Sequence, residues 1–560
     1  MIARFTRSSS TLLVVFLLLL AGLVRPAAAN EGCGIASAHA LATRAGCEIL
    51  ASGGNAFDAA VAVAAALAVV EPFSSGIGGG GFMLLHRASD GFDVFVDARE
   101  TAPSRATREF FLDENGKPKP RASLDGATAA GIPGEPAALD WVASRYGRLP
   151  LAKLLAPAIR LAEQGFPADG RFASATTFRL DALKADPGSA ESFLDNGKAV
   201  ATGFIVVQPK LARTLRMLAR EGAKGFYHGE FAQKLAAAVN QAGGLWEISD
   251  LESYGVIERE PVRFNYRGAR ITTAPLPSSG GLVLAQCLFI LEGVDLAGMS
   301  DADRTHYVAE AMRRGYQDRA RYMGDPAFVK VPVEKLLSRD YAIKRGASID
   351  PARATPSADL AAGAGEAEDT THFSIIDADG NRVAATMSVN GVFGSGFVPA
   401  DTGVLLNNHM DDFALAPGAA NLYKLVGSDA NAVAPGKRPL SSMSPTFVED
   451  DRGVLVLGTP GGSRIISMVL EGILNYVGHP QVDLVGIVAA PRFHHQYLPD
   501  RIEIEPGAFG DSWIAALKAK GHAVESGRRR WGNMQAVFRD RKSGRIETAN
   551  DPRGQSGVLF

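Results

Sequence analysis

The chain has 560 residues, of which 46% are hydrophobic and 21% are charged. It is therefore long enough to bury a large core, and its composition is not that of a disordered protein. Lys plus Arg (58) nearly equals Asp plus Glu (60), so the sequence lacks the basic excess that nucleic-acid binding requires.

The N-terminus resembles a secretory signal peptide. Two arginines precede an apolar run from Leu12 to Val24, and three alanines precede Asn30. A charged start, a short apolar run and small residues before the cut are typical of such peptides, whereas a membrane span needs about 20 apolar residues. We expect residues 1–29 to be removed and the mature protein to be periplasmic or secreted, without a stable membrane anchor.

The chain has three cysteines, Cys33, Cys47 and Cys287. So few argue against a disulfide framework, even for an exported protein. Cys47 and Cys287 lie on apolar faces of predicted helices, where we expect both to be buried as small hydrophobic residues.

Hydrophobic periodicity and breaker residues predict the elements in chain order. Helices are expected at 38–51, 56–70, through most of 135–240, and at 282–291, 307–323, 464–474 and 512–518. Alternation on both sides of Asp90-Gly91 predicts a β-hairpin. From Thr370 onward strands are expected to dominate. Hairpins covered by Ala-rich helices indicate sheets sandwiched between helical layers.

The Asp369-Thr370 bond lies between a loose acidic linker, 359–368, and a predicted hairpin that turns at 378–381. Breaking this bond would give Thr370 both a hydroxyl and a free α-amine, whose reference pKa is about 7.7 to 8.0. The amine then serves as the general base for its own hydroxyl. Taken alone, a Thr-Thr pair at the start of a strand reflects β-propensity more often than catalysis.

Long motifs around this bond closely resemble those of γ-glutamyltransferases, in the same order and at the same spacing. They are TTHFSIIDADGNRVAAT, NGVFGSGFVPADTGVLLNNHMDDF, KRPLSSMSPT and GTPGGSRI, with DARETAP, PLPSSGG and EAMRRGYQDRARYMGDP upstream. The resemblance covers Cys33 to Phe560. It implies an α+β fold, the four-layer α-β-β-α sandwich of N-terminal nucleophile hydrolases. It also implies a large subunit, 30–369, paired with a small catalytic subunit, 370–560, that begins at the nucleophile Thr370.

Three residues are expected to bind the α-carboxylate of the γ-glutamyl group. Arg99 follows a predicted strand, a position at which a lone arginine usually forms an ion pair on the surface. The resemblance instead makes it the carboxylate clamp, a role that suits a planar guanidinium. It makes Ser441 and Ser442, which otherwise indicate only a turn, hydrogen-bond donors to the same carboxylate.

Catalytic groups are expected on one turn and on one strand. Gly461 and Gly462 follow an apolar strand and precede a helix, where bare backbone amides can bind an anion. The resemblance makes them the oxyanion hole. Ser388 and Asn390 are expected at alternate positions of the second strand after Thr370, so that both face the nucleophile. Asn390 would help to hold the glutamyl amine.

The NNHMDDF motif is expected to bind the substrate ammonium. Asp412 matches the carboxylate that pairs with it in the family. His409 departs from the family, which usually has Gln or Glu there, and puts amino-group recognition in doubt. The following segment, 414–427, resembles the lid loop of some bacterial members, with Tyr423 at its tip.

Two other motifs are interpreted as structural. The run 76–81 formally satisfies G-x-G-x-x-G, but a helix precedes it and a strand follows, the reverse of a dinucleotide site. Its glycines are expected to allow close backbone packing beneath the active-site cleft. His494 and His495 are adjacent on a predicted strand, so they point to opposite faces and do not form a metal pair.

The sequence thus predicts an exported, self-cleaving γ-glutamyltransferase or glutathione hydrolase with glutathione-like donors. No metal or organic cofactor is implied. The nearer alternative is an acylase of the same superfamily that removes glutaryl groups from β-lactam precursors; the lid and Asp412 argue against it, and His409 argues mildly for it. The other alternative is an uncleaved secreted binding protein, which a denaturing gel would reveal.

Overall fold

The computed structural model describes residues 33–357, 370–416 and 418–555. The predicted signal peptide and acidic linker, together with Asp369, lie outside these residues. Among the helices of the described ranges, none combines the length and apolar character needed to cross a membrane.

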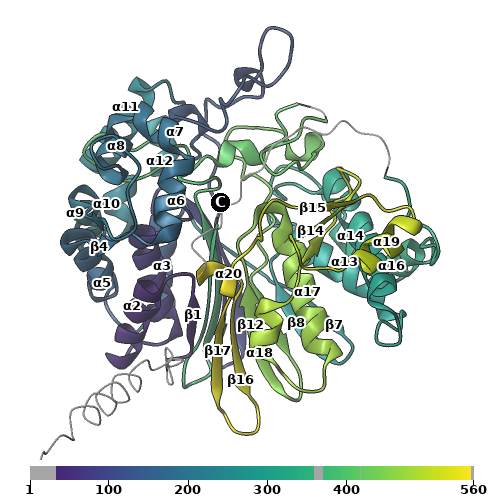
Figure 1. Ribbon diagram of the computed structural model, residues 1–560. Helices are drawn as coiled ribbons and strands as arrows, with labels where there is room; N and C mark the ends of the chain where they lie inside the picture. Colours follow the sequence, from purple (N-terminus) through teal and green to yellow (C-terminus); the bar gives the residue numbers. More distant parts are fainter. Residues whose placement is uncertain (1–32, 358–369, 417, 556–560) are drawn as a thin grey trace, which may run out of the picture. The chain divides into compact units, whose positions relative to one another are not determined.

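Two six-stranded antiparallel sheets form the centre of residues 34–560 (Figure 1). The first sheet has the order β1 (Ile35–Ser37), β9 (Thr371–Ile376), β10 (Arg382–Ser388), β2 (Gly80–Arg87), β3 (Phe92–Ala98) and β6 (Ile257–Arg259). The second has the order β17 (Ile546–Asn550), β16 (Gln535–Asp540), β12 (Gly453–Gly458), β11 (Thr446–Glu449), β8 (Ala269–Thr273) and β7 (Val262–Tyr266). The sheets pack face to face through β9, β10, β12 and β16.

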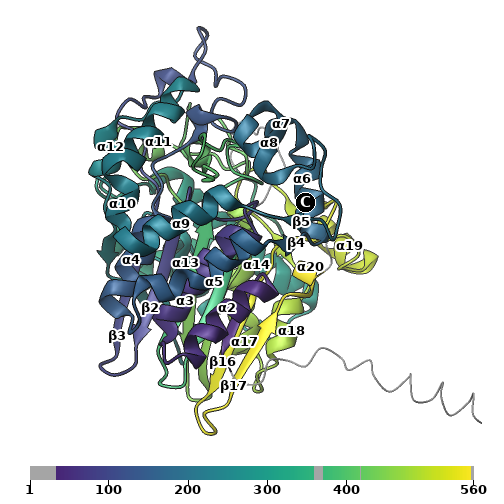
Figure 2. The same ribbon diagram turned by 90° about the vertical axis from the view of Figure 1, so that its left-hand side faces the viewer.

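Helices cover both outer faces, which gives the predicted α-β-β-α sandwich (Figures 1 and 2). On the first sheet lie α2 (Ala40–Ala51), α3 (Ala56–Val70) and α4 (Glu135–Tyr146), with α5 (Leu151–Gln164) packed on α3 and α9 (Pro209–Glu221) packed on α5. On the second lie α13 (Gly280–Glu292), α17 (Ile465–Gly478) and α18 (Leu484–Ala489), with α14 (Asp301–Tyr322) packed on α13.

The predicted helices are confirmed with shifts at their ends, the largest at α14, which begins at Asp301 and not at the predicted Tyr307. Helix α3 has the predicted bounds, and all of its residues are buried between the sheet and α5. Asn55 caps it, because its side chain accepts from the backbone N–H of Asp58 and its own N–H donates to the Asp58 carboxylate. The region 135–240 is mainly helical, with α6 (Gly170–Phe178), α7 (Leu180–Ala185), α8 (Pro187–Phe193), α10 (Ala223–Tyr227) and α11 (Gly229–Gln241). The late helix is α19 (Asp511–Ala519).

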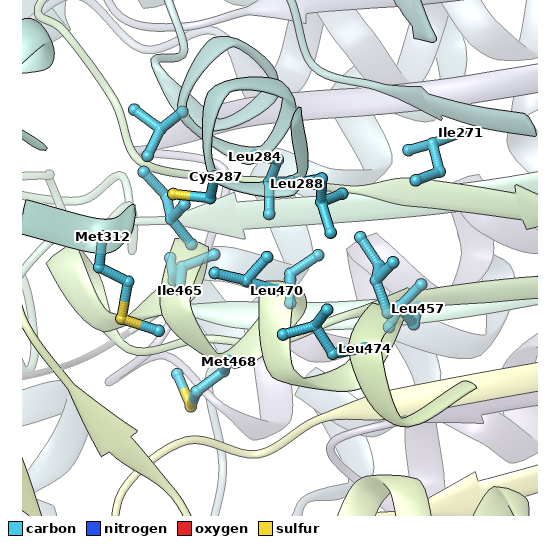
Figure 3. Close-up of a cluster of buried hydrophobic side chains, with 14 of the residues drawn as sticks. Ile271, Leu284, Cys287, Leu288, Met312, Leu457, Ile465, Met468, Leu470 and Leu474 are labelled. Carbon is cyan, nitrogen blue, oxygen red and sulfur yellow. The ribbon is translucent and has the colours of Figure 1, made fainter. Parts of the chain in front are cut away.

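The second helical layer packs tightly on its sheet (Figure 3). Leucines of α13 and α17 meet Ile271 of β8 and Leu457 of β12, and Met312 of α14 closes one side. Cys287 is buried in this cluster as a free thiol, as expected. The expectation for Cys47 was wrong: Cys47 and Cys33 are both disulfide-bonded. Three cysteines are enough for one bridge, which the count alone did not indicate.

Strand directions bring the candidate residues to the same end of neighbouring strands in each sheet. In the first sheet, β9 begins where β10 ends, and β2 begins where β3 ends, because neighbours are antiparallel. This places Thr370, Ser388 and Arg99 at the same end of these neighbouring strands. In the second sheet, β11 begins where β12 ends, so the segment that precedes β11 and the turn that follows β12 also lie together.

Candidate active site

Thr370 stands directly before β9, and its side chain is buried, with 4% of the residue exposed. Its Oγ1 lies 3.2 Å from Oγ of Ser388, the last residue of β10. The Ser388 Oγ also accepts a hydrogen bond from the backbone N–H of Asn390 at 2.7 Å. The hydroxyl of Thr370 is therefore held in a fixed hydrogen-bonded position at the sheet edge.

Asn390 lies beyond β10, which corrects the expectation that it belongs to the strand. Its φ of +77° is in the left-handed region, which asparagine tolerates better than most residues. Its side-chain amide donates to the carbonyl of Asn408 at 3.0 Å, and its Oδ1 accepts from the hydroxyl of Tyr423 at 2.8 Å. Asn390 therefore lines the same pocket as Thr370, as expected, but it does so from a turn and not from the strand.

Arg99 follows β3 and is fully buried. Its Nη2 donates to Oδ2 of Asp412, and its Nε donates to the carbonyl of Pro439 at 3.2 Å. Asp412 is 12% exposed. The structure thus brings together the two residues expected to bind the carboxylate and the ammonium of one amino acid, and these two residues form an ion pair with each other.

Gly461 and Gly462 form the turn between β12 and α17, as predicted. Both have positive φ, 138° and 53°, a conformation that glycine adopts without strain. The ring of Tyr423 lies against Gly462, where an added Cβ would come within 2.3 Å of the ring atoms. The turn faces the pocket with backbone rather than side chains, which suits stabilisation of an oxyanion.

Tyr423 closes the site from the lid segment. Its carbonyl accepts from the Gln496 amide at 3.1 Å, and the backbone N–H of the preceding Leu422 donates to the Asp411 carboxylate at 2.8 Å. The cavity left beneath measures about 20 Å³, room for little more than one water. It is lined by Arg99, Arg319, Thr370, Ser388, Asn390, His409, Asp412, Tyr423, Ser441, Ser442 and Gly462, among others.

A single pocket therefore contains every candidate site residue except Gly461, which directly precedes a lining residue, and Asp369, which lies outside the described residues. The sequence model of the family described as Gamma-glutamyltranspeptidase matches residues 42–560.

The chain belongs to the γ-glutamyltranspeptidase family.

Relatives and solved structures agree with this membership. A glutathione hydrolase proenzyme of Pseudomonas aeruginosa is 44% identical over 537 residues, which cover 94% of this chain and 94% of that protein. A cephalosporin acylase structure from Bacillus halodurans has a TM-score of 0.81 at 28% identity and covers 95% of this chain and 97% of that one. A chain of the Helicobacter pylori γ-glutamyltranspeptidase structure has a TM-score of 0.57 at 40% identity, covering 60% of this chain and 97% of that one.

Arg319 also lines the pocket, although the sequence did not predict a role for it. It lies on α14, is 5% exposed, and donates to Oγ of Ser442 at 3.3 Å and to Oγ of Ser279 at 2.9 Å. Burial lowers its pKa to about 10, so it stays charged at neutral pH. Ser441 lies beside it, with its carbonyl accepting from the Ser279 hydroxyl. Arg319 therefore adds a second cation to the expected carboxylate site.

The nearest imidazole along the chain does not offer a base to Thr370. His372 is fully buried between the sheets, with Nδ1 2.8 Å from Oγ1 of Thr386 and Nε2 3.2 Å from Oγ of Ser374. Burial lowers its pKa to about 3, so it is neutral and engaged on both nitrogens. His372 therefore has no free nitrogen with which to act as a base for Thr370.

His494 and His495 have structural contacts, in line with the sequence interpretation. Nδ1 of His494 lies 2.6 Å from Oγ of Ser467, and Nε2 of His495 lies 3.3 Å from Oδ1 of Asp500. Burial lowers their pKa values to about 3 and about 4.

The glycine run 76–81 packs against backbone, as expected. An added Cβ at Gly78 would come within 2.0 Å of the Leu405 carbonyl, and one at Gly79 within 2.1 Å of the Ser388 carbonyl. Gly78 therefore lets the run approach the backbone at Leu405, and Gly79 lets it approach the end of β10 at Ser388, next to the pocket.

Proposed function

We propose that the protein is an exported proenzyme that cleaves itself before Thr370 and then transfers γ-glutamyl groups. Residues 1–29 would be the signal peptide, 30–369 the large subunit and 370–560 the small catalytic subunit, and the two subunits would remain paired as a heterodimer. The donors would be glutathione and related γ-glutamyl compounds, and the acceptors water, amino acids or peptides. Localisation would be periplasmic or secreted.

One observation carries this proposal: a threonine hydroxyl, an arginine-aspartate pair and a glycine turn meet in one small pocket. Arg99, Ser441 and Ser442 fit the α-carboxylate of an amino acid, and Asp412 fits its α-ammonium. The Arg99–Asp412 pair would separate as each partner binds the opposite charge of the ligand. A γ-glutamyl group bound in this way extends its side-chain carbonyl away from these charges.

Self-cleavage uses the same hydroxyl as catalysis. Oγ1 of Thr370 attacks the carbonyl carbon of Asp369, the bond from that carbon to the Thr370 nitrogen breaks, and the nitrogen takes up a proton. Water then opens the resulting ester. The products are a carboxyl group on Asp369 and a free α-amine and hydroxyl on Thr370.

In the transfer reaction, the free amine of Thr370 takes the proton of its own hydroxyl while Oγ1 attacks the γ-carbonyl of the donor. The backbone N–H groups of Gly461 and Gly462 stabilise the oxyanion, where each such donor is worth about 10²–10³ in rate. The leaving amine receives the proton, and a γ-glutamyl ester remains on Thr370. Water or an acceptor amine then attacks this ester and restores the hydroxyl.

The lid would govern access to this pocket. The Tyr423 ring covers Gly462 and its hydroxyl is bonded to Asn390, so a donor must displace it to reach Thr370. Every step above uses groups of the chain and water, so the proposal includes no metal or organic cofactor.

Mass spectrometry of the purified protein tests the proposal. We expect two chains, Asn30–Asp369 and Thr370–Phe560; the Helicobacter pylori chain covers about the share of the sequence that such a large chain would occupy. Thr370→Ala should remain a single chain. Thr371→Ala is the matched control, because Thr371 is the adjacent buried threonine but bonds to Glu71 instead, and it should still be cut. Cleavage of Thr370→Ala at this bond without added protease would overturn the proposal.

A glutaryl acylase is the second candidate, favoured by the imidazole at position 409 and by the structural similarity to a cephalosporin acylase. A glutaryl group is a γ-glutamyl group without its amine, so the acylase needs no ammonium site. Rates on γ-glutamyl and glutaryl anilides separate the candidates: a transferase should prefer the first and an acylase the second.

A further inference from the structure

A buried carboxylate, Glu100, lies directly behind the two groups that would recognise the donor. It is fully buried, as is the adjacent Arg99, and His409 is 1% exposed. Oε1 of Glu100 lies 2.9 Å from Nδ1 of His409, and its Oε2 lies 3.5 Å from Nη1 of Arg99. One carboxylate therefore touches both the guanidinium and the imidazole of the pocket.

These contacts are short, but their angles are not those of hydrogen bonds. Both oxygens of Glu100, Nη1 of Arg99 and Nδ1 of His409 are buried without a partner of suitable geometry. Buried polar atoms are rarely left so, and hydrogen bonds at active sites often tighten only when the ligand is bound. Glu100 and His409 are therefore close enough for a hydrogen bond that needs only a change in alignment.

The surrounding glycines hold Glu100 in this position. A Cβ at Gly80 would lie 3.0 Å from Cδ of Glu100, and a Cβ at Gly131 would lie 3.1 Å from its Cβ. A second acid, Glu135, is also fully buried, and burial together with the charge of Glu100 raises its pKa to about 8. The neutral form of Glu135 is therefore favoured, and of these two acids it is Glu100 that lies within ion-pair distance of His409.

We propose that Glu100 is a positioning residue for recognition of the donor's amino group. Its carboxylate accepts the Nδ1–H of His409, which fixes the tautomer with a lone pair on Nε2, the nitrogen that points away from Glu100. Nε2 then accepts a hydrogen bond from the α-ammonium of the donor. The other oxygen of Glu100 holds Arg99 for the α-carboxylate. This inference rests on the proposed function.

The contrast between two donors isolates the effect on the amino group. γ-Glutamyl and glutaryl anilides share the carboxylate that Arg99 binds, but only the first has the amine. Any disturbance of Arg99 in Glu100→Gln should lower kcat/KM for both donors alike, so the ratio of the two values reports the amino group alone.

The experiment measures this ratio in wild type, Glu100→Gln, His409→Gln and the double variant. We expect Glu100→Gln to lower the γ-glutamyl to glutaryl ratio by about tenfold or more, as for a lost hydrogen bond to a charged group. In the His409→Gln background the same change should alter the ratio by no more than about twofold, because no imidazole tautomer remains to be set. Glu135→Gln, the matched buried acid that is already neutral, should leave the ratio unchanged.

An unchanged ratio in Glu100→Gln, or an equal fall in both backgrounds, would overturn the inference. If Glu100→Gln fails to mature, Glu100→Asp replaces it: this variant keeps the charge but withdraws the carboxylate from His409, and the same His409-dependent fall is expected. Failure of the proposed function looks different, because wild type itself would then remain uncleaved or would prefer the glutaryl anilide.

Discussion

Two clusters of buried charge differ in how well their polar atoms are satisfied. The pocket cluster comprises Arg99, Glu100, His409 and Asp412. The helix cluster comprises the buried residues His306, Glu310, Arg313 and Arg314 of α14 and His522, together with the exposed Asp500. In the helix cluster, Oε1 of Glu310 accepts from Nε of Arg313 at 3.1 Å, and Oε2 accepts from Nη1 of Arg314 at 2.5 Å. In the pocket cluster, neither oxygen of Glu100 has an aligned partner.

The difference separates structural charges from functional ones. Among the residues of the helix cluster, only Nδ1 of His522 is buried without a partner. This cluster also holds the chain ahead of the linker, since Glu310 accepts from the backbone N–H of Thr355 and Arg313 donates to Ser357. Charges satisfied by the protein stabilise the fold, whereas unsatisfied charges beside a cavity indicate a ligand.

The same reasoning bears on a possible cation site. Donor atoms of His306, Glu310 and His522 lie within 4.8 Å of one another. However, both oxygens of Glu310 are taken by arginines, and Nδ1 of His306 lies 2.8 Å from Nε2 of His522. Glu310 and Nδ1 of His306 are thus engaged within the protein, and only Nδ1 of His522 is left without a hydrogen bond among the three residues. This group is therefore better described as a structural network.

The largest expected effect comes from breaking the helix cluster. Burial opposes ionisation of Glu310, but the hydrogen bond from Thr355 and the charges of Arg313 and Arg314 lower its pKa to about 2. A lowered pKa contributes stability that is present above about pH 4.5 and is lost as the pH falls toward 2. Glu310→Gln removes the carboxylate that pairs with Arg314, while Arg313 keeps its ion pair with Asp500. The loss of this buried charge should destabilise the protein by about 3–5 kcal/mol at neutral pH.

The check is urea unfolding together with KM for a γ-glutamyl anilide. KM should stay within about twofold of wild type, because these sites do not share partners. Glu230→Gln, which breaks an exposed ion pair with Lys234, is the control and should leave stability unchanged. A raised KM with unchanged stability in Glu310→Gln would reverse the comparison between the clusters.

The second prediction breaks the pocket cluster. Arg99→Lys keeps the charge but loses the planar fork that binds a carboxylate through two nitrogens. KM for γ-glutamyl donors should rise about tenfold to a hundredfold, while cleavage before Thr370 persists. Arg314→Lys is the matched control in the helix cluster and should lower stability without raising KM. Unchanged KM in Arg99→Lys would remove Arg99 from the donor site.

Local patterns in the sequence predicted most of this arrangement. The hairpin that starts after Thr370 and the helix 56–70 follow from alternation, turn residues and caps, which are short-range signals. The antiparallel order of the strands then places Thr370 and Arg99 at one edge. The resemblance to a known family supplied the remaining pocket residues, because spacing alone cannot show which loops meet.

The features that the sequence missed depend on distant contacts. Asn390 leaves the strand because its side chain bonds to Asn408 and Tyr423, neither of which alternation can reveal. Arg319 is one of several arginines on α14, and only tertiary packing decides which of them face the pocket. The burial of Glu100 could not be predicted for a similar reason. A charged residue after a strand is usually exposed, and here Gly80 and Gly131 make room to bury it.

The smallest expected effect concerns the hydrogen bond from the donor's ammonium to His409. An imidazole accepts such a bond only through a ring nitrogen that carries no proton, whereas the amide oxygen of glutamine always accepts. We therefore expect His409→Gln to raise the ratio of kcat/KM for γ-glutamyl and glutaryl anilides several-fold, because only the first donor carries the amine.

The measurement is this donor ratio in wild type and in His409→Gln at neutral pH. The glutaryl anilide is the matched control, because it offers the same carboxylate but no ammonium. Identical ratios in the two proteins would show that His409 does not contact the amino group, and the pocket cluster would then act on the donor through Arg99 and Asp412 alone.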